Sequence, residues 1–426
     1  MLHTTRRDAL KTLGLLSSGL FVGSRAAWSA DRSPNEKLNL GIIGPGGRGA
    51  GNLDGVASEN IVAICDADDR SAKSAYEQYP SATKYKDFRK LIENEKLDGI
   101  VVSTTDHTHA HASIYGMRRG LHCYCEKPLT HSVWEARLVA KTAAEAKVAT
   151  QMGTQIHAED NYRRVVEIIQ AGVIGPVERV HVWVGALWGG GERPSQAEAV
   201  PPEVDWDLWL GPAPERPYHS TYLPANWRRW WDFGNGTLGD MGCHYMDLVF
   251  WSLGLRHPKT IAAEGAPPHP ETGPLGLKVT WEFPERGDQP PVTVSWTDGN
   301  AVENVFDGNE LPGAGVYFIG SKGTMFADYG RYRLFPRDKF QGFTPPPQTI
   351  PASIGHHAEW IEACKTGGPT TCNFDYSGAL TEAVLLGTVA YRTGKKLEWD
   401  PVALKATNAP EADQFLRRNY RKGWEL

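Results

Sequence analysis

The spacing of apolar residues predicts two regions of different architecture, and the first extends from residue 37 to residue 155. Short apolar runs in this region alternate with stretches that carry the apolar spacing of a helix face. The predicted strands cover residues 38–43, 61–65, 99–102, 121–125 and 148–152, and the predicted helices cover residues 87–94, 108–119 and 132–146. Repeated alternation of strand and helix is typical of a doubly wound parallel sheet. We therefore expect an α/β domain of the Rossmann type.

The second region, residues 156–426, has a different pattern, because strands separated by turn residues dominate it. A helix is predicted over residues 157–170, and residues 177–184 alternate as in a half-exposed strand. Further strands are predicted over residues 260–264, 277–283, 292–296, 315–320, 324–327 and 332–335, with helices over residues 353–366 and 377–393. We expect residues 410–426 to form a helix and a tail that pack on the sheet. The pattern indicates an α+β domain with a large, mostly antiparallel open sheet.

Residues 187–236 form a long segment that is rich in Pro and Trp and has no strong periodicity. A loop of this length is usually either functional or disordered, and its aromatic content argues against disorder. Either the segment covers an active-site cleft and offers Trp and Arg side chains to a sugar, or it is a packed connector. The sequence favours neither interpretation. Trp230 is the residue of this segment that we take as a candidate for sugar binding.

The first 33 residues resemble an export signal. Arg6 and Arg7 precede an apolar stretch that extends from Leu13 to Val22, and small residues follow. The paired arginines are similar to the twin-arginine type of signal, although Ala9 replaces its usual aromatic residue. A membrane anchor is the alternative, but the apolar stretch is short and rich in Gly and Ser. We expect export to the periplasm, with membrane tethering if the signal stays uncleaved and no membrane span once it is removed.

Composition narrows the class of function. The chain has 426 residues, enough for two domains, and its net charge is -5. No cluster of basic residues stands out, so we expect no nucleic-acid partner. The six Cys residues form neither a C-x-x-C pair nor a zinc pattern, and we expect most of them to be buried, although an oxidising compartment would permit a disulfide.

A glycine-rich turn follows the first predicted strand and fits the G-x-G-x-x-G spacing of a dinucleotide-binding site. Its glycines are Gly44, Gly46 and Gly49, and Arg48 lies inside the turn. Glycine permits the tight turn and the close approach of a pyrophosphate to the start of a helix. Asp66 ends the second strand, where a carboxylate accepts hydrogen bonds from the adenosine ribose. This residue favours NAD, but the nearby basic residues Arg70 and Lys73 leave NADP open.

Three further groups of residues have the character of a catalytic site. They are the loop Ser103-Thr104-Thr105-Asp106-His107-Thr108-His109-Ala110-His111, the tripeptide Glu126-Lys127-Pro128, and the set Asp240, His244 and Asp247. The members of the last set stand at i, i+4 and i+7, on one helix face, where a carboxylate can orient an imidazole and raise its basicity. This set, or the three alternate histidines, could also hold a metal. We predict no metal, because alternate side chains at the start of a helix do not converge.

These motifs resemble the Gfo/Idh/MocA family, which is named after glucose–fructose oxidoreductase and inositol dehydrogenase. The resemblance covers residues 37–340 and is strongest in the first domain. It implies that Lys127 meets both the substrate and the nicotinamide, and that a helix carrying Asp240 and His244 faces this lysine. His244 would then be the general base, Lys127 would hold the substrate oxygen, and Asp240 would orient the groups. Family members commonly have proline where this chain has Thr105.

The same resemblance implies the remaining contacts of the site. Thr104, His107 and Glu126 would border the cofactor. Asp247 and Tyr245, together with the Trp230 already described, would contact the substrate. The second sheet would mediate contacts in a homo-oligomer.

The function implied is an NAD(P)-dependent oxidoreductase that acts on a sugar, polyol or cyclitol. Because an exported enzyme meets little free nucleotide, we expect a tightly held cofactor that is regenerated in place. One alternative is a redox-assisted glycoside hydrolase or lyase, in which Asp247 or Tyr245 would supply a second acid or base. Another is a non-catalytic sugar-binding protein, but the presence of Lys127, His244 and the three glycines argues against it.

Overall fold

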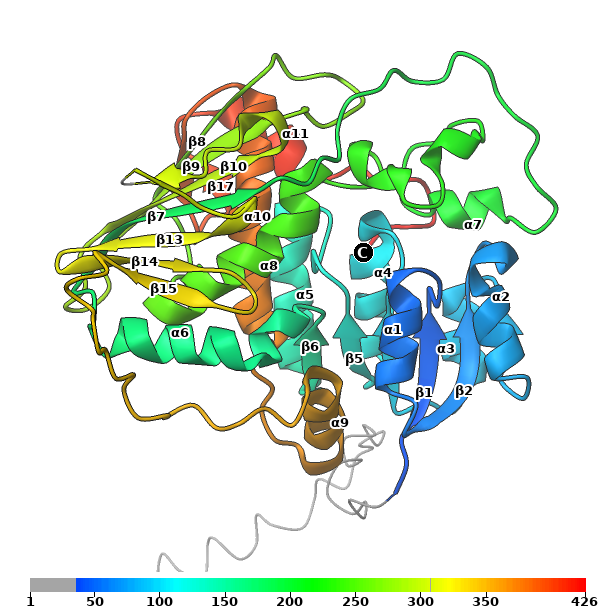
Figure 1. Ribbon diagram of the computed structural model, residues 1–426. Coiled ribbons are helices and arrows are strands. Elements are labelled where there is room, and N and C mark those ends of the chain that lie inside the picture. Colours follow the sequence, from blue (N-terminus) through cyan, green and yellow to red (C-terminus); the bar gives the residue numbers. More distant parts are fainter. Residues whose placement is uncertain (1–35, 307) are drawn as a thin grey trace, which may run out of the picture.

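The computed structural model describes residues 36–306 and 308–426, and it places two sheets side by side with helices between them (Figure 1). The expected export signal, residues 1–33, lies outside the described residues. Within the described ranges, none of the helices combines the length and the apolar character needed to cross a membrane. All six Cys residues are buried and none is in a disulfide.

The first domain contains the predicted Rossmann sheet, whose six strands are all parallel in the order β3-β2-β1-β4-β5-β6. The strands are β1 (Asn39–Ile43), β2 (Asn60–Cys65), β3 (Thr83–Tyr85), β4 (Gly99–Val102), β5 (His122–Cys125) and β6 (Thr150–Met152). The helices are α1 (Arg48–Gly55), α2 (Asp69–Gln78), α3 (Phe88–Asn94), α4 (Asp106–Met117) and α5 (Val133–Ala146). The strand order reverses between β1 and β4, where ligands bind to sheets of this kind.

The local sequence explains why these elements form. Strand β4 is buried along its whole length, which is why it reads as an uninterrupted apolar run. Helix α5 begins with a capping box, in which Ser132 and Glu135 satisfy each other's free backbone amides. Helices α2 and α3 begin at Asp68 and Asp87, whose side chains accept backbone hydrogen bonds.

The second domain contains a nine-stranded sheet in the order β15-β14-β13-β7-β10-β9-β8-β16-β17. Its pairs are antiparallel except β7 with β10, so the prediction of a mostly antiparallel sheet is confirmed. The strands are β7 (Val177–Val184), β8 (Thr260–Gly265), β9 (Leu277–Phe283), β10 (Val292–Asp298), β13 (Ala314–Gly320), β14 (Gly323–Ala327), β15 (Tyr332–Phe335), β16 (Leu397–Asp400) and β17 (Lys405–Ala406), with a separate pair formed by β11 (Val305–Phe306) and β12 (Asn309–Glu310).

Helices α8 and α10 connect the two domains, because both pack against the second sheet and α10 also packs on α5 (Figure 1). The indole of Trp281 on β9 donates a hydrogen bond to the carbonyl of Ala383, which fixes α10 on the sheet. The helices of this region are α6 (Asp160–Gln170), α8 (Gly236–Leu253), α9 (His356–Thr366), α10 (Phe374–Thr393) and α11 (Asp413–Leu416), with 3-10 turns η1 (Gln155–Ala158), η4 (Gly299–Ala301) and η5 (Pro410–Ala412).

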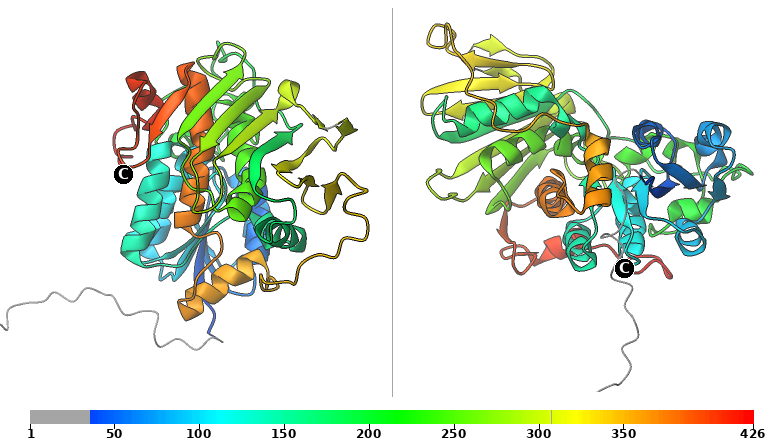
Figure 2. Two further views of the ribbon diagram at one scale, coloured as in Figure 1. Left: turned by 90° about the vertical axis from the view of Figure 1, so that its left-hand side faces the viewer. Right: turned by 90° about the horizontal axis from the view of Figure 1, so that it is seen from below.

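Two C-terminal segments reach back to the first domain. Helix α9 lies beneath the Rossmann sheet, and its Trp360 is fully buried against that domain (Figure 2). The expectation of a helix and a tail packed on the sheet over residues 410–426 is wrong in part. Regular helix ends with α11, and Trp424 near the chain end packs on Phe88 and His111 of the first domain. Aromatic contacts of this kind have no local sequence signal.

The Trp-rich segment passes above the Rossmann domain and contains α7 (Trp206–Leu210), η2 (Ser220–Tyr222) and η3 (Asn226–Arg229) (Figure 1). A small core of its own holds it together. The buried members of that core are Trp209, Leu210, Ala213, Tyr222, Trp227, Trp230 and Phe233. The segment is therefore a packed unit, and it also forms one wall of the cleft described below.

Candidate active site

The glycine turn between β1 and α1 is built so that side chains are excluded. A Cβ atom at Gly49 would lie 1.9 Å from the carbonyl oxygen of Gly44, and one at Gly44 would lie 2.8 Å from the backbone of Ser103. A Cβ atom at Gly46 would lie 1.9 Å from the hydroxyl of Ser71. Helix α1 follows without a side-chain cap at its start; the amides of Gly49 and Ala50 donate to the carbonyls of Gly46 and Gly47, and among the described residues the amides of Gly47 and Arg48 have no backbone acceptor, so they are available to a phosphate. The turn fits the pyrophosphate of a dinucleotide.

Asp66 lies at the end of β2, where the sequence predicted the ribose-binding carboxylate. One of its oxygens accepts a hydrogen bond of 2.9 Å from the amide of Asp68, and burial raises its pKa to about 7. The guanidinium of Arg70 binds both oxygens of Asp68, at 2.8 and 2.6 Å. Arg70 is therefore already neutralised, and the geometry favours the unphosphorylated ribose of NAD.

A cleft of about 660 Å³ extends from the glycine turn to α8, between the Rossmann domain and the Trp-rich segment. Most of the predicted site residues line it. They are Gly44, Gly46, Arg48, Asp66, Thr104, Glu126, Lys127 and His244. Side chains from both domains thus meet in one cavity, which is the usual location of a small-molecule site.

Lys127, which lines this cleft, forms an ion pair with Asp240, which is not among the lining residues. The ammonium nitrogen of Lys127 lies 2.6 Å from Oδ1 of Asp240 and 2.7 Å from the main-chain oxygen of the same residue. Burial by itself would raise the pKa of Asp240, but the charges of Lys127 and Arg228 hold it well below its usual range. Two of the three ammonium protons are engaged in this way, which leaves one donor for a ligand.

His244 lines the same cleft and is neutral. Burial and the charge of Lys127 lower its pKa to about 3. Its Nδ1 atom is buried and has no hydrogen-bond partner within the described residues. A neutral imidazole next to an ammonium can accept a proton from a ligand that the ammonium holds.

The charge of Asp240 raises the pKa of His244, as expected, but among the described residues its carboxylate makes no hydrogen bond to this imidazole, so the expected orienting contact is not formed. The carboxylate is held by other groups, namely Lys127 and Arg228 at Oδ1 and the indole of Trp188 at Oδ2, 2.7 Å away. The spacing i, i+4 places the two side chains on one helix face but does not make them touch. Arg228 and Trp188 are functional candidates that the sequence did not single out, because their partner lies on α8 and was not predictable.

Glu126 is held in place by several donors, as a residue at the cofactor boundary should be. Asn52 and Gln155 each donate an amide hydrogen bond to its Oε1 at 2.9 Å, and Arg48 approaches the same oxygen at 3.3 Å. Asn52 and Gln155 had no signal in the sequence. Thr104 lines the cleft beside this cluster and receives a hydrogen bond from Thr108.

His107 does not border the cofactor site, contrary to the prediction. Its ring is fully buried, packs on Trp209 and Phe233, and lies 3.1 Å from the carbonyl of Trp209. His109 lines the cleft in its place and bonds to two backbone carbonyls. His111 points to the carbonyl of Trp424, so the three histidines diverge.

Trp230 and Tyr245 do not reach the cleft either, so the structure does not place them where a substrate would bind. Trp230 is buried in the core of the Trp-rich segment, where Trp227 and Arg228 line the cavity instead. Tyr245 is buried and stacks on Tyr329, with ring centroids 4.6 Å apart. Neighbouring aromatic residues in a sequence cannot reveal which of them is turned outward.

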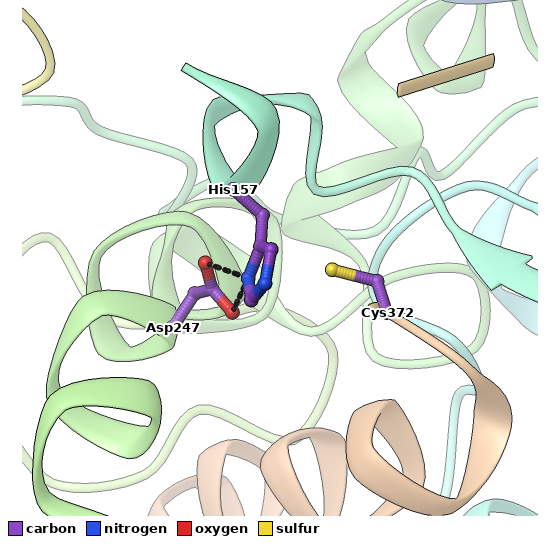
Figure 3. A group of neighbouring side chains, drawn as sticks. All are labelled: His157, Asp247 and Cys372. Atoms are coloured by element: carbon purple, nitrogen blue, oxygen red, sulfur yellow. Dashed lines mark hydrogen bonds and ion pairs between the residues drawn. The ribbon is translucent and has the colours of Figure 1, made fainter. Parts of the chain in front are cut away.

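Asp247 is fully buried and serves a different purpose from the predicted substrate contact. Both its oxygens lie within 3.0 Å of Nδ1 of His157, and the hydroxyl of Tyr376 donates to it at 2.7 Å. Burial would lower the pKa of His157, but Asp247 raises it to about 10, so the pair is charged. Figure 3 shows the imidazole between the carboxylate and the thiol of Cys372, and one ligand atom from each of the three residues lies within 4.8 Å of the other two.

Comparison with known proteins follows the same division into domains. Residues 38–154 match the family model GFO_IDH_MocA, described as the NAD-binding Rossmann fold of an oxidoreductase family. Residues 160–426 match the model GFO_IDH_MocA_C2, described as the C-terminal alpha/beta domain of the oxidoreductase family.

Individual relatives are distant. Inositol 2-dehydrogenase of Salmonella paratyphi B is 26% identical over 150 residues, which are 34% of this chain and 45% of that protein. The chain thus spans less than half the length of this and several other curated relatives that it matches. Myo-inositol 2-dehydrogenase of Thermotoga maritima is 25% identical over 298 residues, or 68% of this chain and 75% of that protein.

Among solved structures, the WlbA dehydrogenase of Bordetella pertussis, in complex with NADH and UDP-GlcNAcA, shares the fold with a TM-score of 0.62. Its sequence identity is 18%, and the likeness covers 86% of this chain and 99% of that chain. The two family models together account for most of the chain, from the glycine turn to the C-terminus. The protein therefore belongs to the Gfo/Idh/MocA family of oxidoreductases.

Proposed function

We propose that the protein removes a hydride from a C–OH group of a sugar, polyol or cyclitol and transfers it to NAD bound in the cleft. The observation that carries this proposal is the presence of a lysine ammonium and a neutral imidazole in the same cleft as the glycine turn. Lys127 and His244 both line that cavity, and the glycine turn forms its other end.

The charge of each side chain determines its role in the proposed reaction. The free donor of Lys127 binds the substrate oxygen and stabilises the negative charge that develops on it as the C–H bond breaks. His244 accepts the hydroxyl proton, which a neutral imidazole can do throughout the physiological pH range. Asp240 positions Lys127, and Arg228 and Trp188 hold Asp240 in turn.

The cofactor residues follow from the same geometry. Gly44, Gly46 and Gly49, with the start of α1, would hold the pyrophosphate, and Asp66 would hold the adenosine ribose. The bound nicotinamide supplies the hydride acceptor. Glu126, which three side chains fix at the base of the cleft, would border the cofactor together with Arg48 and Thr104.

We further propose that the protein is exported to the periplasm and keeps its nucleotide through many turnovers. Support comes from the paired arginines and the apolar stretch within residues 1–33. The family resemblance supports a homo-oligomer formed through the second sheet. An exported enzyme of this kind would have to reduce a second sugar, or return the hydride to the same one, to regenerate its cofactor.

The test is a substrate panel with purified protein that lacks the first 33 residues. Inositols, aldoses and alditols are supplied with NAD or NADP, and formation of the reduced nucleotide is followed by absorbance. The proposal expects reduction of NAD by at least one compound of these classes, and reduction that is about 10²–10³-fold slower in the variant Lys127→Met. Binding of NAD without reduction by any member of the panel would contradict it.

A further inference from the structure

Asp106 is a buried acid of the cleft for which the proposed reaction has no use. It begins α4, is 3% exposed, and lines the same cavity as Lys127, Arg228 and His244. Among the described residues, no other side chain and no backbone group outside its own residue donates a hydrogen bond to its carboxyl group. Its own backbone amide is its one protein donor among these residues, and a buried carboxyl group with so few partners is costly unless a ligand adds another.

The neighbouring side chains of the loop each have at least one hydrogen-bond partner in another residue. Thr108 donates to Thr104 at 2.7 Å, and the two ring nitrogens of His109 lie 2.7 Å from the carbonyl of Pro128 and 3.1 Å from that of Thr104. His107 faces the carbonyl of Trp209. These side chains hold the loop in shape, whereas the carboxyl group of Asp106 remains available to the cavity.

We infer that Asp106 is a further substrate-binding residue, whose carboxyl group binds a second hydroxyl next to the one held by Lys127 and His244. The inference rests on the proposed function and narrows its substrate class to compounds with adjacent hydroxyl groups. A secondary alcohol with a single hydroxyl would leave Asp106 unsatisfied.

The charges around Asp106 fit this assignment. Arg228 on η3 and Lys127 after β5 favour its charged form, while Asp240 on α8 opposes it. Burial dominates and raises the pKa of Asp106 to about 8, so near neutral pH the carboxyl group can donate as well as accept a hydrogen bond. A hydroxyl group both donates and accepts a hydrogen bond, so a carboxyl group that can also donate and accept is a suitable partner for it.

The test compares sugar binding with nucleotide binding in the same protein. The probe is the sugar or polyol oxidised fastest in the substrate panel, with its analogues that lack one hydroxyl next to the oxidised carbon. Affinities for the probe and for NAD are measured by calorimetry in the wild type, Asp106→Ala and Asp106→Asn. Asp160→Asn is the matched control, because Asp160 also opens a helix, α6, but is exposed and lies away from the cleft.

Asp106→Ala should weaken probe binding about 3- to 10-fold, the effect of one lost hydrogen bond, and leave NAD affinity unchanged. Asp106→Asn keeps a donor and an acceptor and should bind the probe within about threefold of the wild type. One deoxy analogue should bind equally to the wild type and Asp106→Ala. If Asp106→Ala does not fold, Asp106→Ser, which cannot reach the same hydroxyl, replaces it with the same expectation.

Two results would overturn the inference while leaving the proposed function intact. Unchanged probe affinity in Asp106→Ala would show that the carboxyl group has no ligand, and a selective loss of NAD affinity would assign it to the cofactor. A panel without any oxidised compound refutes the proposed function itself, at an earlier step. The two failures are therefore distinguishable.

Discussion

Replacing Lys127 by methionine tests the chemical core of the site. Methionine keeps a side chain of similar length but removes the ammonium that would bind the substrate oxygen. Asp240 would not be left unpaired, because Arg228 lies 3.0 Å from its Oδ1 and Trp188 lies 2.7 Å from its Oδ2. We therefore expect the variant to fold and to bind NAD.

The size of the effect follows from the two roles of the ammonium. Loss of a donor to a developing oxyanion lowers kcat by about 10²–10³, or about 2.7–4 kcal/mol of transition-state stabilisation. Loss of the charge-assisted hydrogen bond to Asp240 lowers the free energy of unfolding by about 1.5–3 kcal/mol. Both side chains of this pair are only about one-tenth exposed, so solvent screens the interaction weakly.

Lys365→Met is the matched control for the loss of stability. The ammonium of Lys365 lies 2.9 Å from Glu59, with side-chain exposures of 11% and 3%, close to the 10% and 11% of the Lys127 pair. This second pair does not line the cleft. Both variants should lose similar stability in urea, but only Lys127→Met should lose kcat in the assay of reduced nucleotide. A kcat within about tenfold of the wild type in Lys127→Met, with NAD bound, would refute the assigned role.

Three further predictions concern the turn, the base and the buried ion pair. Gly49→Ala should weaken NAD binding by about 1–3 kcal/mol in calorimetry, because its Cβ atom would meet the carbonyl of Gly44 at 1.9 Å, whereas Gly51→Ala should not. Because the pKa of His244 is lowered to about 3, its imidazole stays neutral as the pH falls through 6.5 and should give kcat no acid limb there. The measurement uses saturating NAD and Asp106→Asn, so that Asp66 and Asp106, whose pKa values are raised to about 7 and 8, do not contribute; a limb near 6.5 under these conditions would contradict the assignment of His244 as the base. Asp247→Ala should lower the free energy of unfolding by about 3–5 kcal/mol, since it removes the partner of the buried imidazole of His157, but kcat of the folded protein should be preserved. A selective loss of kcat would instead show that Asp247 takes part in catalysis.

The parts of the fold that were predictable are those with a strong local pattern. Strands β4, β7, β9 and β15 have the predicted bounds because alternation or a continuous apolar run defines them. The cofactor turn was predictable for a related reason, since a backbone that excludes side chains requires glycine at fixed spacing. Strands β3 and β17 were missed because three and two residues carry too little periodicity, and the four-residue β16 was missed as well.

The parts of the site that were not predictable depend on tertiary contacts. Asp240 and Asp247 occupy the same helix, yet one faces Lys127 and the other faces His157 from a segment 90 residues away. A spacing of seven residues did not distinguish these surroundings. Likewise, Arg228 and Trp230 are near neighbours in one motif, but only Arg228 lines the cleft. Sequence pattern thus identified the helix that faces Lys127, and the packing around it decided which groups each side chain contacts.

The central claim is that the cleft carries a hydride from a substrate carbon to a bound nicotinamide. The most direct measurement supplies a panel sugar or polyol that carries deuterium on its C–OH carbons, followed by denaturation and mass spectrometry of the released nucleotide. In a single turnover that is quenched before the hydride can be passed on, the account predicts a reduced NAD that is one mass unit heavier from the wild type, and about 10²–10³-fold slower formation of this species in Lys127→Met. Oxidised, unlabelled NAD from the wild type with a bound sugar would contradict it.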